Sequence, residues 1–123
     1  MSVRLSHRSG EILGKLQRAL RLPERPPLLR LALAQGMLAY AGELPHEDSR
    51  GPEIPLKVIT GGQDTLMDAL VVETLGYSFD ATERKGLYKR LVDLGLSVMY
   101  QRFEQMNTAT DFLVQIARQS VAS

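Results

Sequence analysis

The chain has 123 residues, of which 44% are hydrophobic and 24% are charged, and its formal net charge is +1 at pH 7. These values are typical of one globular domain with an adequate core, so residues 1–123 are expected to fold as a single domain. The sequence contains no Cys, which excludes disulfides, thiol catalysis and thiolate metal sites. No apolar run approaches the roughly 18 residues of a membrane span, and the first residues do not resemble a signal peptide, so the expected location is the cytoplasm.

The near-neutral total conceals an uneven distribution of charge. Residues 1–42 carry seven Lys and Arg against two acids, a net charge of +5, and residues 84–123 carry six against three. Between them, residues 43–83 carry two basic residues against nine acids. A basic segment attracts polyanions, above all nucleic acid, so the pattern favours a binding protein without naming its target.

A short strand and a first helix are predicted at the start of the chain. Residues 2–6 alternate polar and apolar side chains, which is typical of a half-buried strand, although a frayed terminus would read the same way. Ser6 suits the N-cap of a helix that runs to about residue 22. The apolar stripe of this helix, at the spacing of one buried face, consists of Ile12, Leu13, Leu16 and Leu20.

A second helix is predicted over residues 28–40. Pro27 suits its first position, where a missing N–H does no harm, and Gly42 suits the C′ position after its end. This helix is apolar on almost every side. In so small a protein such a helix usually contacts a second subunit as well as its own core, so we expect a homo-oligomer that assembles through this helix and the long fourth one.

Residues 43–62 form an acidic segment rich in Pro and Gly, and they are predicted to be a long loop with one short strand at 56–59. Residues 63–123 are expected to be a helical half. Its predicted helices cover residues 63–75, residues 81–104 after a capping box at Asp80 and Glu83, and a final segment capped within residues 108–111. The predicted fold class is therefore all-α, with about five helices and a short N-terminal β-ribbon.

The basic residues of segment 1–42 are the candidate DNA-binding residues. At about 100° per residue, Arg8, Lys15 and Arg18 fall within roughly 80° on one flank of the first helix. The full candidate set is Arg4, Arg8, Lys15, Arg18, Arg21, Arg25 and Arg30. The ordinary alternative is a solvated helix face. Arg30 lies among leucines and alanines, so pairing with an acid across a subunit interface is an equal alternative for it.

A strand, a helix, a turn and an apolar helix within about 40 residues make up the layout of a ribbon-helix-helix unit, which pairs its strands across a dimer; β-ribbon proteins of this general kind present strands to DNA. The chain also resembles the DNA sulfur modification protein DndE family over most of its length. The matching residues are, in order, Arg4-Leu5-Ser6, Leu13-x-Lys15-Leu16-x-Arg18, Leu29-Arg30-Leu31-Ala32, Gly61-Gly62, the Leu91–Gly95 stretch and Asp111-Phe112-Leu113 with Ala117.

The resemblance implies a homo-oligomer, expected to be a tetramer, that binds double-stranded DNA with a preference for nicked duplex. Its implied role is in bacterial phosphorothioation of the DNA backbone, where partner proteins of the modification complex carry out the sulfur transfer. The implied protein is not an enzyme and needs no cofactor or metal. By position, Lys15, Arg18 and Arg30 are the matching basic residues, and Arg4 and Arg8 are added from local charge and periodicity.

Two other functions stay open. One is an oligomeric scaffold or adaptor that does not bind DNA. The other is a metal-dependent nickase that uses Asp64 and Asp68, one turn apart on the predicted third helix, with Glu73 nearby, because paired carboxylates can hold Mg²⁺. That site would need a third ligand and a base for which the sequence has no signature, and acids are also preferred in the first turn of any helix.

A second basic group lies on the predicted long helix and consists of Lys85, Lys89 and Arg90. After assembly this group could extend the cationic surface. The ordinary alternative, which we favour for it, is that the three side chains keep the exposed flank of a core helix in contact with water.

Overall fold

The computed structural model describes residues 1–106 and 113–118. The chain is mostly helical, with one short two-stranded antiparallel sheet, as predicted. Its elements are, in chain order, β1 (Ser2–Arg4), α1 (His7–Ala19), α2 (Pro26–Ala39), β2 (Glu53–Pro55), α3 (Leu56–Thr60), α4 (Asp64–Leu75) and α5 (Ala81–Gln105). Residues 113–118 are also helical, and the predicted cap at 108–111 lies outside the described residues.

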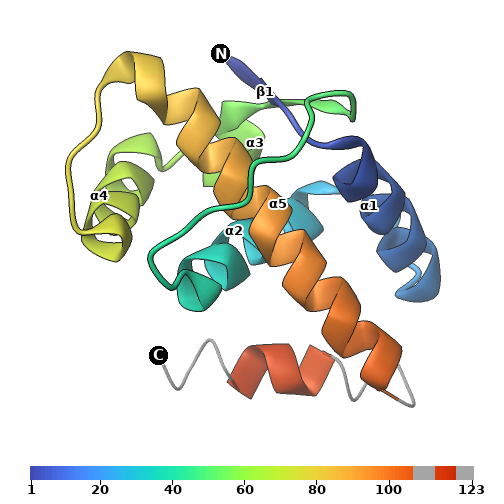
Figure 1. Ribbon diagram of the computed structural model, residues 1–123. Coiled ribbons are helices and arrows are strands. Elements are labelled where there is room, and N and C mark those ends of the chain that lie inside the picture. Colours follow the sequence, from blue (N-terminus) through green and yellow to red (C-terminus); the bar gives the residue numbers. More distant parts are fainter. Residues whose placement is uncertain (107–112, 119–123) are drawn as a thin grey trace.

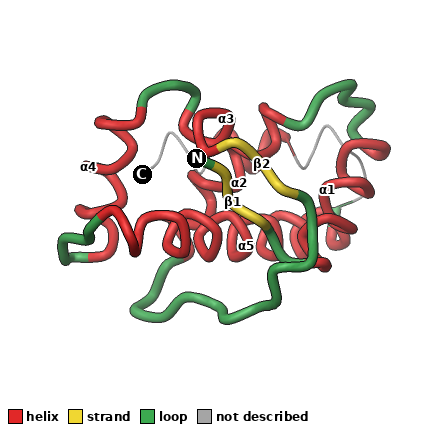
Figure 2. The backbone as a smooth tube through the Cα atoms, turned by 90° about the horizontal axis from the view of Figure 1, so that it is seen from above, coloured by secondary structure: helices red, strands yellow, loops and turns green. Residues whose placement is uncertain are grey.

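The long helix α5 runs across the molecule, and the other elements are arranged along it (Figure 1). Helix α4 lies beside the N-terminal end of α5, α1 lies on the opposite side of the molecule, and α2 packs against the middle of α5. The acidic loop between α2 and β2 crosses α5 on its way to the ribbon of β1 and β2, which Figure 2 shows from above.

The core lies between α1, α2, α3 and α5. Its largest fully buried side chains are Leu5, Leu13, Leu16, Leu28, Leu29, Leu33, Ile59, Tyr88, Leu91, Leu96 and Met99. Each side chain of this size contributes about 1.5–3 kcal/mol when it is removed from water. Of the stripe predicted for the first helix, Ile12, Leu13 and Leu16 are buried, whereas Leu20 is the C-cap after the helix and is half-buried.

Helix α1 begins where the sequence predicts, but it ends earlier. Ser6 is the N-cap, and its hydroxyl accepts a hydrogen bond from the Ser9 N–H at 3.0 Å. The helix stops after Ala19 because Arg21 adopts a left-handed conformation (φ 54°). The N–H groups of Arg21 and Leu22 then donate to the carbonyls of Arg18 and Gln17, which closes the helix with a Schellman motif.

Strand β1 pairs with β2 of the same chain, with Val3 opposite Ile54. A ribbon-helix-helix unit instead pairs its first strand across a dimer. The prediction of a strand at 56–59 is wrong, because residues 53–55 form the strand and α3 begins at Leu56. Helix α3 buries Leu56, Ile59 and Thr60, and this spacing of three and four residues is helical, whereas a strand would alternate.

Part of the apolar surface of helix α2 is buried within the chain, and Leu38 of this helix is exposed. The helix packs against α5 and α3, and its buried residues are Leu28, Leu29, Ala32, Leu33, Gln35 and Gly36. Its boundaries differ slightly from the prediction, since Pro26 is its first residue and Tyr40 is an extended C-cap. Gly42 therefore lies beyond the C′ position, although its φ of 97° does require glycine.

The C-terminal helices agree with the prediction. Helices α4 and α5 match the predicted ranges 63–75 and 81–104 closely, and Gly76 ends α4 with φ 81°. The capping box at the start of α5 is present, because Asp80 accepts from the Glu83 N–H and the Glu83 carboxylate accepts from the Asp80 N–H. In the described part of the chain, no helix combines the length and hydropathy needed to cross a membrane.

Candidate nucleic-acid interface

Three of the predicted DNA-binding residues share the exposed face of α1. Arg8, Lys15 and Arg18 are all exposed and lie on one flank of the buried stripe of that helix. The same face also carries His7 and Glu11, whose side chains interact at 2.8 Å between Nε2 and Oε1. Because Glu11 lies near the start of the helix, the uninterrupted positive part of the face is its C-terminal half.

The ammonium group of Lys15 lies over an aromatic ring. Its Nζ lies 5.3 Å from the centroid of the Tyr100 ring, which comes from the C-terminal half of α5. A cation over an aromatic face is attracted to the ring. Sequence reasoning did not find this contact, because Tyr100 is distant in the chain and no local pattern links it to α1.

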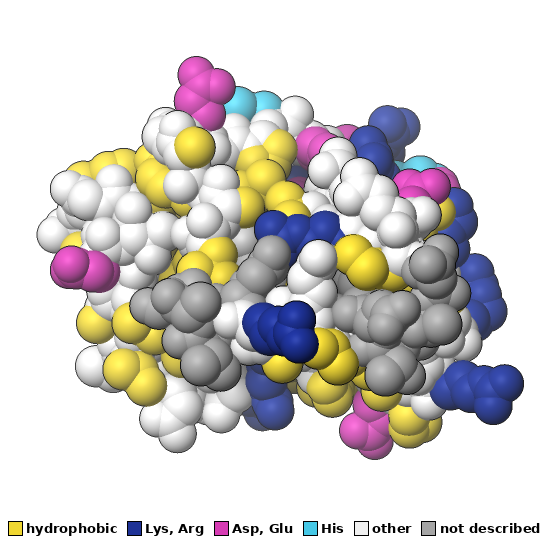
Figure 3. All heavy atoms as spheres, turned by 90° about the horizontal axis from the view of Figure 1, so that it is seen from below, with side chains coloured by type: hydrophobic (Ala, Val, Ile, Leu, Met, Phe, Trp, Pro, Cys, Tyr) yellow, Lys and Arg dark blue, Asp and Glu magenta, His cyan; other side chains and the backbone are white. Residues whose placement is uncertain are grey.

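The positive surface continues from α1 into the connection with α2. Arg21 is exposed directly after the helix, and Arg25 is half-buried, with its Nε donating to Gln17 Oε1 at 3.4 Å. In the view of Figure 3, Lys and Arg side chains are frequent along the edge of the molecule on the α1 side, whereas hydrophobic side chains are frequent on the α4 side. Lys15 and Arg18 are thus exposed in the C-terminal half of α1, and Arg21 is exposed directly after it.

Arg4 is separated from this group and is neutralised by an acid. Its guanidinium donates to the Gly51 carbonyl at 3.1 Å and forms an ion pair with Glu53 at 3.4 Å across the ribbon. A second acid of the same loop, Asp48, accepts from the His7 N–H at 2.9 Å at the start of α1. The hydrogen bonds from the backbone N–H groups of His7 and Arg50 hold the pKa of Asp48 below its usual value, so this carboxylate is charged at neutral pH.

Arg30 contacts a different element. Its Nε donates to the Val58 carbonyl at 3.4 Å, and its guanidinium lies close to Gly61 at the end of α3. Within residues 1–106 and 113–118 it forms no ion pair with an acid. The structure therefore does not bring Arg30 together with the basic residues of α1.

The two carboxylates considered as a metal site bind a guanidinium instead. Arg84 lies 3.0 Å from Asp68 Oδ1 and 3.5 Å from Asp64 Oδ2, and the Tyr88 hydroxyl donates to Asp68 at 2.8 Å. Burial and the bond to Asp68 raise the pKa of Tyr88, so its hydroxyl stays a donor. Thr60 also donates to Asp64. Among the described residues, no group of three or more His, Cys, Asp or Glu could hold a metal ion.

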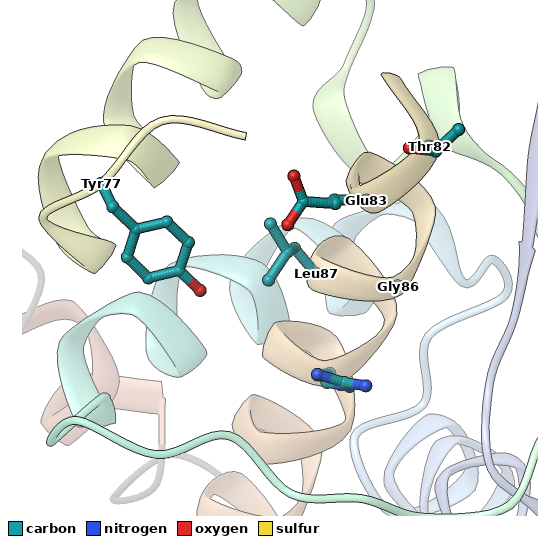
Figure 4. Close-up of a pocket in the computed structure, with 6 residues that line it drawn as sticks. Tyr77, Thr82, Glu83, Gly86 and Leu87 are labelled. Atoms are coloured by element: carbon teal, nitrogen blue, oxygen red, sulfur yellow. The ribbon is translucent and has the colours of Figure 1, made fainter. Parts of the chain in front are cut away.

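The second basic group of α5 does not form one surface. Lys89 is almost buried and lies 2.7 Å from Asp93, so only Lys85 of the group is fully exposed. Arg90 lines a shallow hollow near the start of α5, where the Tyr77 ring faces Leu87 and the Glu83 carboxylate (Figure 4). The hollow holds one acid and one base, so it adds no net positive charge.

A comparison with protein-family models and a search of curated proteins find no match to this chain. Support for a function therefore comes from the geometry described above and from the motifs of the sequence itself.

Proposed function

We propose that this chain is a non-catalytic DNA-binding protein of a bacterial DNA sulfur modification system, and that it binds duplex DNA, preferably nicked, through phosphate contacts. The observation that carries the proposal is the group of exposed cations at the C-terminal end of α1. Lys15, Arg18 and Arg21 lie there without an acidic partner among the described residues. The resemblance to the DndE family supports the choice of DNA as the polyanion, and the other proteins of that system are the proposed partners.

Phosphate contacts explain the expected affinity but give no sequence preference. Each phosphate that a Lys or Arg neutralises releases condensed counterions, and the slope of log K against log salt steepens by about 0.9 per contact. Contacts of this kind position a protein on the duplex, whereas sequence is read from base edges. We therefore expect affinity that falls steeply with salt and differs little between duplexes of different sequence.

A gel-shift or anisotropy series with one nicked and one intact duplex tests the proposal. The test variant is Lys15→Ala with Arg18→Ala. The matched control is Lys57→Ala with Lys85→Ala, which removes two exposed cations from α3 and α5. We expect the test variant to bind more weakly and to reduce the salt slope by about two, while the control keeps the wild-type slope. Salt-independent binding, or equal behaviour of the two variants, contradicts the proposal.

We further propose that the protein is a homo-oligomer, as the resemblance implies. The sequence pattern placed the subunit contact on α2 and α5, whereas the exposed apolar side chains favour a contact that includes α4. Leu66 and Leu70 of α4 are 53% and 41% exposed, and Leu38 and Tyr77 are exposed as well. Light scattering measures the mass directly, and Leu66→Ser with Leu70→Ser is expected to lower it. A monomeric wild-type protein contradicts this part of the proposal.

The same exposed apolar side chains favour a second candidate function, a scaffold that joins other proteins without binding DNA. This candidate predicts no shift of either duplex at low salt, together with capture of the modification proteins that survives nuclease treatment. DNA binding with the charge dependence given above would rule it out.

A further inference from the structure

The acidic loop lies against one end of the basic segment. Residues 47–53 pass the start of α1, where Asp48 accepts from the His7 N–H and Glu53 pairs with Arg4. Asp48 also lines a hollow together with His7, Arg8 and Arg50. The negative charges of the loop are therefore close to the N-terminal end of α1 and not to its C-terminal end.

The loop is held in place here by backbone contacts. The Gly51 N–H donates to the Leu5 carbonyl at 2.8 Å, and the Leu5 N–H donates to the Pro52 carbonyl at 3.0 Å. A Cβ on Gly51 would lie 2.0 Å from the Ser6 carbonyl oxygen, so the two backbones are in contact. Lys89 Nζ also donates a hydrogen bond to the Glu47 carbonyl at 3.4 Å. The backbone of this segment is thus fixed beside the start of α1, and the Asp48 carboxylate contacts the helix directly.

The two ends of α1 consequently differ in charge. Near the N-terminal end, the described contacts bring Arg4, Arg8 and Arg50 together with Glu11, Asp48 and Glu53, and Glu47 adjoins Asp48 in the chain. Along the C-terminal half of α1 and the connection that follows it, residues 15–25 carry four cations and one acid, which are Lys15, Arg18, Arg21 and Arg25 against Glu24. At physiological salt, electrostatic interactions between exposed charges are screened beyond about 8 Å. An approaching phosphate therefore interacts mainly with the charges of the end that it contacts.

We propose that the acidic segment 47–53 sets the edge of the DNA surface: it confines the duplex to the C-terminal end of α1 and keeps Arg4 and Arg8 out of phosphate contact. This inference rests on the proposed DNA binding and refines it. Carboxylates next to the path of a DNA backbone repel it, and like charges brought together cost affinity. On this inference Lys15, Arg18, Arg21 and Arg25 form the binding group. Arg4 and Arg8 lie beside the acids of the loop, and Arg30 lies apart from both groups, next to Val58.

The inference is tested with Glu47→Gln combined with Glu53→Gln. The matched control is Glu43→Gln with Glu73→Gln, two exposed acids located at the far end of the loop and on α4. The probe is the nicked duplex at a fixed, moderate salt concentration. We expect the test variant to bind roughly threefold to tenfold more tightly than wild type, and the control to change affinity less than twofold.

A second comparison tests the residues themselves. Arg4→Ala with Arg8→Ala is expected to leave wild-type affinity almost unchanged, but to weaken binding severalfold in the background that lacks the charges of Glu47 and Glu53. The salt slope of that background should be steeper than wild type by about two, one unit for each new phosphate contact.

The outcomes separate the two proposals. If wild-type protein binds no duplex at low salt, both the proposed function and the inference about segment 47–53 are contradicted. Two outcomes contradict only the inference about segment 47–53, when wild type does bind. In the first, the test and control variants tighten binding equally. In the second, Arg4→Ala with Arg8→Ala weakens wild-type binding severalfold. Far-ultraviolet circular dichroism and urea unfolding of each variant confirm that the fold is retained.

Discussion

Gly36 of α2 and Gly95 of α5 meet backbone to backbone where the two helices cross. A Cβ on Gly95 would lie 1.7 Å from the Ala32 carbonyl oxygen and 2.9 Å from the Gly36 nitrogen, and a Cβ on Gly36 would lie 2.0 Å from the Leu91 carbonyl oxygen. Neither position has room for a side chain. The missing side chains allow the closest approach of the two helices that contribute much of the core.

This contact predicts that Gly95→Ala and Gly36→Ala each destabilise the protein by about 2 kcal/mol or more, because the helices must separate to make room. Helix propensity alone predicts the opposite sign, a gain of about 1 kcal/mol for alanine. Urea unfolding of the two variants measures the free energy of unfolding directly.

Gly86 provides the control for this prediction. It also lies inside α5, but a Cβ there would have no atom within 4 Å. Gly86→Ala is therefore expected to stabilise the protein by about 1 kcal/mol. Equal effects of alanine at positions 86 and 95 would show that the helix crossing is not tight.

The sequence predicts those parts of the fold that depend on neighbouring residues. Ser6 and the capping box at Asp80 mark the starts of α1 and α5, because a cap acts within one turn of its own helix. Local sequence does not explain why position 36, inside a helix, is glycine, because the cause is a contact with Gly95, 59 positions later in the chain. The sequence pattern also fails to predict α3, because the burial of its residues depends on contacts with distant parts of the chain.

The same distinction between local patterns and long-range contacts applies to the candidate site. Helical periodicity predicts correctly that Arg8, Lys15 and Arg18 share an exposed face. It does not predict that Tyr100 lies beneath Lys15 or that Glu53 neutralises Arg4, because these contacts join residues far apart in the sequence. Charge composition therefore identified a basic segment, whereas the fold decides which of its members are exposed together.

The left-handed conformation of Arg21 gives a prediction in which stability and binding change in opposite directions. A residue with a Cβ is disfavoured at a φ of 54°, and glycine is not. Arg21→Gly is therefore expected to stabilise the protein by about 0.5–1 kcal/mol while it weakens binding to duplex DNA. Thermal unfolding and anisotropy measure the two effects. Arg21→Asn, which also tolerates this conformation, should lose the charge with little change in stability, and a destabilised glycine variant would contradict the assignment of strain.

The buried carboxylate of Asp93 is expected to be important for stability. It accepts from the Ser6 N–H at 3.2 Å and from the Ser9 hydroxyl, and it lies 2.7 Å from Lys89 Nζ, whose side chain is 12% exposed. Removing one partner leaves the other charge without compensation, so Asp93→Ala is expected to cost about 3 kcal/mol or more in urea unfolding.

The coupling between Asp93 and Lys89 separates this cause from simple loss of packing. Asp93→Asn retains an acceptor for Ser6 but leaves the ammonium of Lys89 unpaired. Adding Lys89→Met to that variant should recover part of the lost stability, because the unpaired charge is removed. Strictly additive losses in the double variant would argue against a coupled pair.

The N-cap of α5 predicts how stability changes in acid. The Thr82 hydroxyl and the Glu83 N–H donate to the Asp80 carboxylate and hold its pKa below the usual value. A carboxylate with a lowered pKa stabilises the folded protein above its unfolded pKa of about 4, and this contribution is lost as pH falls through the folded value. Asp80→Asn caps a helix about as well but does not titrate, so the stability advantage of wild type over this variant should shrink as pH falls below about 4. Thr82→Val, which removes the hydroxyl donor and keeps Asp80, should flatten the acid dependence in part. An advantage that stays constant between pH 7 and pH 2 in urea unfolding would contradict the role given to the charged cap.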